Sequence, residues 1–250
     1  MHWYDNITGE PRYEIPYADG RPGKTPTLTD ARKLNLVPSV TSVLGILDKP
    51  GLNTWKVDQA VLAALTNPVI HDGMPQDEML AIIRRDAEAY SKMAMQRGSD
   101  IHDTIEKCFA GTPYANEYVP HASAAIDLIY MTAGAQYWQV EAHLPGGLGY
   151  GGRCDLYNDE YLVDFKTKEF NEHDIDAGKV KGWPEQEVQL VAYDLGFGGG
   201  PRRLVNVFVS TTVPGLVHWF EWPAKNYDNA VEKWWATLNC WYAWRNYKPL

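Results

Sequence analysis

The chain has 250 residues, enough for one sizeable domain or one domain with a helical elaboration, and its 45% hydrophobic content supports a packed core. A formal net charge of −9 has the wrong sign for a protein that coats nucleic acid by bulk electrostatics, but it leaves room for metal-binding carboxylates offset by bound cations. The three cysteines lie far apart, which argues against a disulfide framework and a structural zinc site and excludes a four-cysteine iron–sulfur cluster. We expect neither an export signal nor a membrane span.

The N-terminal third is expected to be an arm followed by helices. Residues 1–36 are rich in Gly, Pro, Asp and Tyr and have little periodicity, so they predict an irregular or short-stranded arm. Ser39 or Thr41 can cap a short helix, and a longer helical run is expected over residues 53–65. On that run Trp55 either faces a ligand or packs on a neighbouring helix, and packing is the favoured alternative.

Two helices are expected next. Apolar residues at helical spacing over residues 76–96 predict the first, which we expect to be interrupted at Arg97 and Gly98. The second is expected over residues 99–109, where His102 and Glu106 lie four apart and share one face. A lone histidine on a helix is usually structural or solvated, so His102 alone is weak evidence for a metal ligand.

A helix over residues 122–133 and a strand over residues 137–144 are expected to follow. Glu141 lies on this strand, and the pattern leaves open whether it points toward the next strands or is a charge at the rim. The strand leads into a Gly-rich turn over residues 146–152.

Residues 151–168 contain two alternating apolar and polar runs joined by a polar turn, a pattern typical of a β-hairpin. Because side chains in a strand alternate between faces, Asp164 and Lys166 share one face, and the hairpin can bring Asp155 beside Asp164. Two acids and a lysine at one point suit a metal site for phosphodiester hydrolysis. From the hairpin alone, a surface ion pair between Lys166 and one aspartate is about as well supported.

The remaining chain predicts further helices and strands. Residues 169–182 are expected to be a charged loop that is mobile or contacts substrate. A helix over residues 185–195, stopped by Gly196, would place Gln189 and Tyr193 on one face, whereas the simpler alternative is a surface Gln beside a half-buried Tyr. Strands are expected over residues 203–210 and 216–222. The last element is an aromatic helix expected to dock on the sheet, with base stacking as a minor alternative.

Four short motifs together resemble one family of nucleases. They are Gly98-Ser99-Asp100-Ile101-His102 with Glu106, Gly152-Arg153-Cys154-Asp155, Asp164-Phe165-Lys166 and Gln189-Leu190-Val191-Ala192-Tyr193. Through them the chain resembles the PD-(D/E)XK nuclease superfamily, in the branch with RecB-type nuclease domains, mitochondrial genome maintenance exonucleases and many phage exonucleases. Each motif alone is weak evidence, and the four in order are strong evidence. The four cysteines of the cluster-containing relatives are absent.

The resemblance implies a fold and an organisation. The fold would be α/β, with a restriction-endonuclease-like core whose mixed central sheet is flanked by helices, plus an N-terminal helical part. We expect residues 1–97 to form the arm and the helical part that covers the cleft, and residues 98–250 to form the nuclease core with the C-terminal aromatic helix, as one compact unit. The cytoplasm of a bacterial or phage-infected cell is the expected location.

The resemblance also implies roles for individual residues. Asp155 and Asp164 would coordinate Mg2+ or Mn2+, joined by His102 and the main-chain carbonyl of Phe165. Lys166 would act with the two aspartates in catalysis. The residues that position DNA or brace the site would be Gln189, Tyr193, Glu106 and Glu141.

The implied activity is that of a metal-dependent deoxyribonuclease acting as an exonuclease at single-stranded or duplex DNA ends, in recombination, repair or phage DNA metabolism. Three alternatives stay open: an endonuclease on the same core, a catalytically inactive DNA-binding subunit, and a metal-binding module with no nucleic-acid partner.

Overall fold

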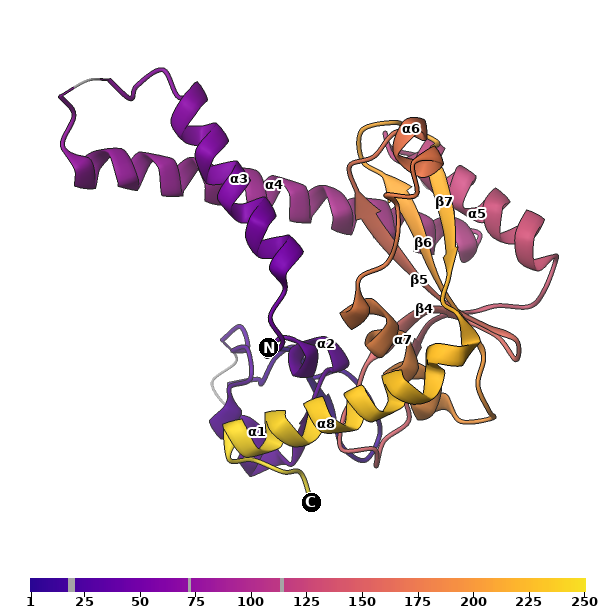
Figure 1. Ribbon diagram of the computed structural model, residues 1–250. Helices are drawn as coiled ribbons and strands as arrows, with labels where there is room; N and C mark the ends of the chain where they lie inside the picture. Colours follow the sequence, from indigo (N-terminus) through magenta and orange to yellow (C-terminus); the bar gives the residue numbers. More distant parts are fainter. Residues whose placement is uncertain (18–20, 72, 113–114) are drawn as a thin grey trace.

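The structure is a computed structural model that describes residues 1–17, 21–71, 73–112 and 115–250. Its centre is a five-stranded mixed sheet in the order β3–β4–β5–β6–β7, with helices on both faces (Figure 1). A second, two-stranded sheet joins β1 and β2 near the N-terminus. The expected α/β class, with a mixed central sheet flanked by helices and a helical region before it, is confirmed.

The elements follow the chain in this order. The strands are β1 (Trp3–Asp5), β2 (Leu36–Pro38), β3 (Gln139–His143), β4 (Arg153–Tyr157), β5 (Tyr161–Lys168), β6 (Arg203–Ser210) and β7 (Val217–Glu221). The α-helices are α1 (Leu28–Leu34), α2 (Val40–Leu44), α3 (Pro50–Thr66), α4 (Gln76–Phe109), α5 (Val119–Ala133), α6 (Glu172–Asp176), α7 (Pro184–Phe197) and α8 (Tyr227–Arg245).

The middle of the sheet is a parallel pair of strands, β5 and β6. They pair from Tyr161↔Arg203 to Lys168↔Ser210, and the other neighbouring strands pair in antiparallel fashion. A parallel pair needs a crossover connection, and here α6 and α7 supply it. The register places residue 164 of β5 directly beside residue 206 of β6.

Two hydrophobic cores lie on opposite faces of the sheet. On one face, α4 and α5 pack against alternate strand residues, among them Val163, Phe165, Val205 and Val207. On the other face, α7, α8 and the N-terminal elements build the larger core. Since successive strand residues point to opposite faces, Asp164 and Lys166 of β5 lie on the α7 face.

Helix α4 runs without interruption from Gln76 to Phe109, so the expected break at Arg97 and Gly98 is wrong. A Cβ atom on Gly98 would lie 2.8 Å from the Thr167 Oγ1 atom of β5. The glycine therefore serves the close approach of helix and strand and does not end the helix. The expected division between residues 97 and 98 falls inside α4 and stays a prediction.

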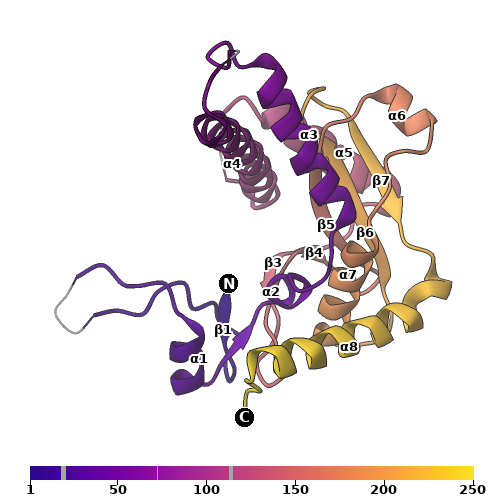
Figure 2. The ribbon, with the colours of Figure 1, turned by 60° about the vertical axis from the view of Figure 1, so that its left-hand side comes forward.

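Helix α3 and the first half of α4 form a helical hairpin that projects from the sheet (Figures 1 and 2). No described residue of α3 is buried. The Trp55 ring of α3 lies 6.1 Å from the Tyr90 ring of α4, which confirms packing on a neighbouring helix as the role of this tryptophan. Ser39 caps α2 as expected, accepting a hydrogen bond from the main-chain N–H of Ser42 at 3.0 Å.

The N-terminal arm is more ordered than its composition indicated. It contains β1 and also α1, which begins at a Thr27–Asp30 capping box. Trp3 of β1 is 1% exposed and its ring lies 6.1 Å from that of Trp241 in α8. Helix α8 packs through its aromatic residues mainly on α7, α2 and the N-terminal arm, so the expected docking on the sheet itself is wrong.

Two expectations about the crossover segment need correction. The charged loop contains α6, which begins at an Asn171–Asp174 capping box. Gly196 lies inside α7 and does not end it. A Cβ atom at this position would lie 2.7 Å from the Leu144 side chain, so this glycine also permits close packing. The helix ends at Phe197, and its C-cap is Gly198, whose φ of +66° suits glycine.

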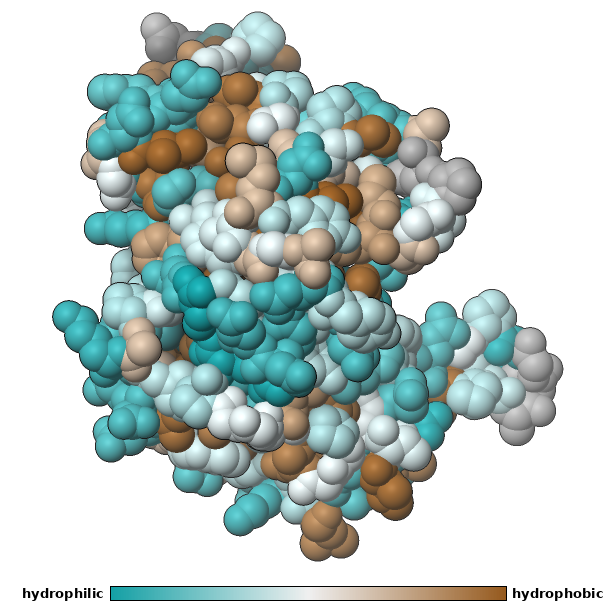
Figure 3. Space-filling view, turned by 90° about the vertical axis from the view of Figure 1, so that its right-hand side faces the viewer, coloured by the Kyte–Doolittle hydropathy of each residue, from teal (hydrophilic) through white to brown (hydrophobic). Residues whose placement is uncertain are grey.

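Figure 3 shows the side of the molecule formed by α5, with hydrophobic side chains gathered in its upper part and a hydrophilic area at mid-height. The exposed large apolar residues of α5 are Tyr130 and Met131. Within the described parts of the chain, no helix is both long and apolar enough to cross a membrane.

Candidate functional site

Strand β5 carries the two charged groups at the centre of the candidate site. Asp164 and Lys166 are two residues apart and therefore lie on one face. The Lys166 Nζ atom lies 2.6 Å from the Asp164 Oδ2 atom, and the aspartate is 4% exposed. A carboxylate this buried needs a charged or hydrogen-bonding partner, and the lysine supplies one.

Helix α7 adds Gln189 above this ion pair. Its Nε2 atom donates to Asp164 Oδ1 at 3.0 Å, and its Oε1 atom accepts from Lys166 Nζ at 3.1 Å. The same Nε2 atom lies 3.2 Å from the hydroxyl of Tyr193, one helical turn later. Burial raises the pKa of Tyr193 well above its usual value, so this hydroxyl is protonated. The amide holds both members of the ion pair in one orientation.

Asp155 lies where β4 and β5 stop pairing. The backbone pairs Tyr157↔Leu162 and Leu156↔Val163 lie between the hairpin turn and Asp155, and the next contact is the hydrogen bond that the Asp155 Oδ2 atom accepts from the Phe165 main-chain N–H at 2.7 Å. The side chain thus takes the place of a backbone acceptor in the ladder. Burial and the charge of Asp164 raise the pKa of Asp155.

Helix α4 brings His102 to the same point. The His102 Nδ1 atom lies 3.6 Å from Asp155 Oδ2, and its ring lies edge-on to the ring of Phe165 at a centroid distance of 6.1 Å. Gly98, one turn earlier on α4, permits the helix to approach β5 closely enough for these contacts. The structure therefore brings His102, Asp155, Asp164 and Lys166 together.

Glu141 of β3 lies opposite Asp155 in the sheet register, between the pairs Val140↔Leu156 and Ala142↔Cys154. Its φ of +50° is unusual for a residue other than glycine in a strand. Its carboxylate forms an ion pair with Arg153. Burial, followed by the charge of Asp155, raises the pKa of Glu141 to about 7, and the charge of Glu106 adds to this shift.

Two residues of this network escaped the sequence interpretation, Asn206 and Trp222. Asn206 is fully buried in β6, and its Nδ2 atom donates to Asp164 Oδ2 at 3.0 Å. Trp222 follows β7, and its indole N–H donates to Asn206 Oδ1 at 2.8 Å. The available signal was a single polar residue inside the apolar run over residues 204–209.

A cavity of about 220 Å3 adjoins Asp155. The body of the protein contributes Gly152, Arg153 and Tyr193 to its walls. The N-terminal arm and α2 contribute the other lining residues, which are His2, Tyr4, Tyr13, Ser39 and Thr41. The arm, predicted from its composition only as irregular or short-stranded, therefore walls the space beside the candidate site.

The donor set fits a hard divalent cation. No group of three or more His, Cys, Asp or Glu side chains is preassembled as a metal cage within the described ranges. The carboxylates of Asp155 and Asp164 nevertheless lie near enough for the charge of one to raise the pKa of the other. A cation that interacts with both would offset this repulsion, and carboxylate oxygens are ligands that Mg2+ and Mn2+ accept.

Comparisons with known proteins give little more. No protein-family model and no curated protein matches the sequence. Among solved structures, an alkaline exonuclease from Laribacter hongkongensis aligns with 87% of this chain and 94% of its own, at 15% identity and a TM-score of 0.39. We draw no functional conclusion from so low a TM-score.

Proposed function

We propose that the chain is a metal-dependent deoxyribonuclease that works as an exonuclease at DNA ends. One observation carries the proposal: Asp155, Asp164 and Lys166 converge beside a cavity, and the amide of Gln189 forms hydrogen bonds with both Asp164 and Lys166. Two acids and a lysine at one point suit metal-assisted hydrolysis of a phosphodiester. The preference for DNA ends rests on the motif resemblance.

In the proposed mechanism, Asp155 and Asp164 would hold Mg2+ or Mn2+, joined by His102 and the main-chain carbonyl of Phe165. Such an ion, when bound, would supply a water of lowered pKa and stabilise charge on the scissile phosphate. Lys166 lies beside Asp164 and has its ammonium held by Gln189, so it is placed to neutralise charge that develops on the phosphate oxygens.

The other groups position substrate or brace these residues. Tyr193 supports the amide of Gln189, and also lines the cavity next to Asp155. Arg153 offers the cavity a cation, and Tyr4 and Tyr13 offer it aromatic rings, a combination that suits a nucleotide with its phosphate. Glu141 holds Arg153 through their ion pair, and the charge of Glu106 acts on both.

The test is hydrolysis of single-stranded and duplex DNA labelled at either end, with Mg2+ or Mn2+. Asp164→Ala and Lys166→Ala are each expected to lower kcat about 100-fold or more. Lys168→Ala is the matched control, because Lys168 lies on the same face of β5 and its Nζ atom lies over the Phe208 ring, 5.5 Å from the centroid. This control is expected to keep kcat within about threefold.

Each alternative has its own outcome in this assay. A wild type that cuts nothing, or Asp164→Ala and Lys166→Ala variants that cut as well as the wild type, would contradict the catalytic assignment. Cleavage of covalently closed circular DNA would identify an endonuclease. Binding of labelled DNA in Ca2+ without hydrolysis in Mg2+ or Mn2+ would identify a DNA-binding subunit, and absence of DNA binding a metal-binding module.

A further inference from the structure

Asn206 is a fully buried amide inside the apolar run over residues 204–209 of β6. Its neighbours Val205 and Val207 are also 0% exposed, and the parallel register sets Asn206 beside Asp164. Burying an amide is unfavourable unless both its donor and its acceptor find partners. Both ends of this amide are partnered, on one side by Asp164 and on the other by Trp222.

The two partners fix the orientation of the amide. The Nδ2 atom lies 3.0 Å from Asp164 Oδ2 and 3.3 Å from the Asp164 main-chain oxygen, and Oδ1 lies 2.8 Å from the Trp222 Nε1 atom. An indole N–H only donates, so it selects the orientation in which the Asn206 carbonyl faces it and the NH2 group faces Asp164. The opposite orientation would place an oxygen against the carboxylate and leave the indole N–H without an acceptor.

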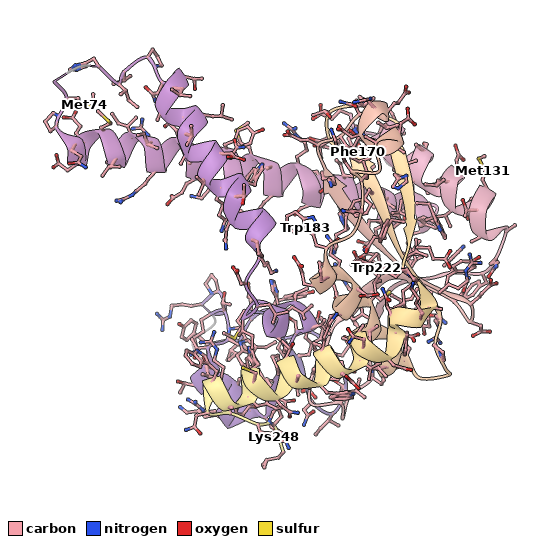
Figure 4. The ribbon with its side chains drawn as sticks, in the orientation of Figure 1. Met74, Met131, Phe170, Trp183, Trp222 and Lys248 are labelled. Atoms are coloured by element: carbon pink, nitrogen blue, oxygen red, sulfur yellow. The ribbon has the colours of Figure 1, made fainter. Side chains whose placement is uncertain are left out.

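Trp222 is itself held in place by its surroundings. Its ring lies 5.0 Å from that of Phe220, and its main-chain N–H donates to Leu204 O at 2.9 Å. A Cβ atom on Gly182, just before α7, would lie 2.2 Å from the indole. Figure 4 shows Trp222 in the body of the protein, far from Met74 at the tip of the helical hairpin of α3 and α4.

We propose that Asn206 is a positioning residue for Asp164, and that Trp222 acts on Asp164 through Asn206. The inference rests on the proposed function, because it concerns the carboxylate assigned there to the metal. Lys166 and Asn206 both contact Asp164 Oδ2, but only Asn206 is neutral and fully buried. It orients the carboxylate without neutralising it, so the negative charge stays available to the cation.

The first test measures Mn2+ affinity of the full chain by electron paramagnetic resonance of free Mn2+, which needs no nuclease activity. Asn206→Leu keeps the branching of the side chain but replaces its polar atoms by methyl groups, and it is expected to weaken Mn2+ binding about 10-fold or more. Trp222→Phe keeps an aromatic ring beside Phe220 and is expected to weaken it about 5-fold. The matched control is Trp219→Phe, on the opposite face of β7, with an expected change under about twofold.

The double variant separates positioning from general packing. If Trp222 acts through Asn206, then Asn206→Leu/Trp222→Phe binds Mn2+ as Asn206→Leu does, within about twofold. With DNA as substrate and subsaturating Mn2+, kcat is expected to fall in parallel with Mn2+ affinity. The KM for DNA is expected to change less than about twofold.

Several results would overturn the inference. One is a Trp222→Phe variant that binds Mn2+ as tightly as the wild type. Another is a double variant in which the losses of Mn2+ affinity from the two substitutions multiply. A third is a Trp219→Phe variant that loses as much Mn2+ affinity as Trp222→Phe. A wild type that binds Mn2+ but cuts no DNA would contradict the proposed nuclease, while the Mn2+ series would still decide the role of Asn206. A wild type that binds no Mn2+ would contradict both. If Asn206→Leu fails to fold, the comparison of Trp222→Phe with Trp219→Phe decides.

Discussion

Replacing Glu141 by Gln is predicted to stabilise the metal-free protein at alkaline pH. The Glu141 side chain is 17% exposed and lies opposite Asp155 in the sheet. Burial is the largest cause that raises its pKa from 4.5 to about 7, and the charge of Asp155 is the next, with Arg153 acting in the opposite direction. The ionised carboxylate is therefore a net cost to the folded state, in spite of its ion pair.

The sign of the effect follows from the two pKa values. The raised pKa means that the folded chain binds the Glu141 proton more tightly than the unfolded chain, so this stabilisation is complete below pH 4.5 and is lost as the pH rises through about 7. The difference of 2.5 between about 7 and 4.5 corresponds to about 3 kcal/mol. Partial solvation of the side chain reduces this to about 2 kcal/mol. Glu141→Gln, which cannot ionise, avoids the loss.

The assay is urea unfolding in EDTA at a series of pH values between about 4.5 and 8.5. The free energies of unfolding of wild type and Glu141→Gln should agree at the acidic end, and the variant should be about 2 kcal/mol more stable at the alkaline end. Glu88→Gln, at an exposed position of α4, is the control and should show no such divergence. A difference between wild type and Glu141→Gln that is independent of pH would refute the reasoning.

Two further predictions concern packing and a buried ion pair. Gly98→Ala should destabilise the protein by about 1 kcal/mol, because the new methyl group meets Thr167 Oγ1. In a Thr167→Ala background the same change should be neutral or stabilising, because alanine favours the helix. Urea unfolding of the four proteins measures both effects, and a loss of stability in both backgrounds would contradict this prediction. Arg202→Met should cost about 3 kcal/mol of unfolding free energy, since it leaves the 1% exposed Asp194 carboxylate without its cation, and a loss below about 1 kcal/mol would contradict that.

The strands of the core were predictable because their periodicity is local. The alternation over residues 151–168 predicted the hairpin, and the boundaries expected for β6 agree with those observed, Arg203–Ser210. The glycines misled the prediction of helix ends. Gly98 and Gly196 both lie inside helices, because a glycine can permit close packing with a distant element as well as end a helix, and the sequence does not reveal that element.

The candidate site was predictable where its residues are neighbours on one element. Asp164 with Lys166, and Gln189 with Tyr193, follow from the periods of a strand and a helix. Asn206 was not predictable, because it meets Asp164 only through the parallel pairing of β5 and β6, a property of the topology.

The charges around the site explain why its orientation depends on neutral donors. Among the described residues of the site, the carboxylates of Asp155, Asp164 and Glu141 interact with the cations of Lys166 and Arg153. The Phe165 main-chain N–H and the amides of Gln189 and Asn206 orient the two aspartates without neutralising them. A divalent cation bound to these aspartates would favour ionised carboxylates and so lower the pKa values of Asp155 and Glu141, which burial and the charge of a neighbouring aspartate now raise. Added Mn2+ should therefore reduce the stability advantage of Glu141→Gln at alkaline pH, because it stabilises the fully ionised wild-type site most.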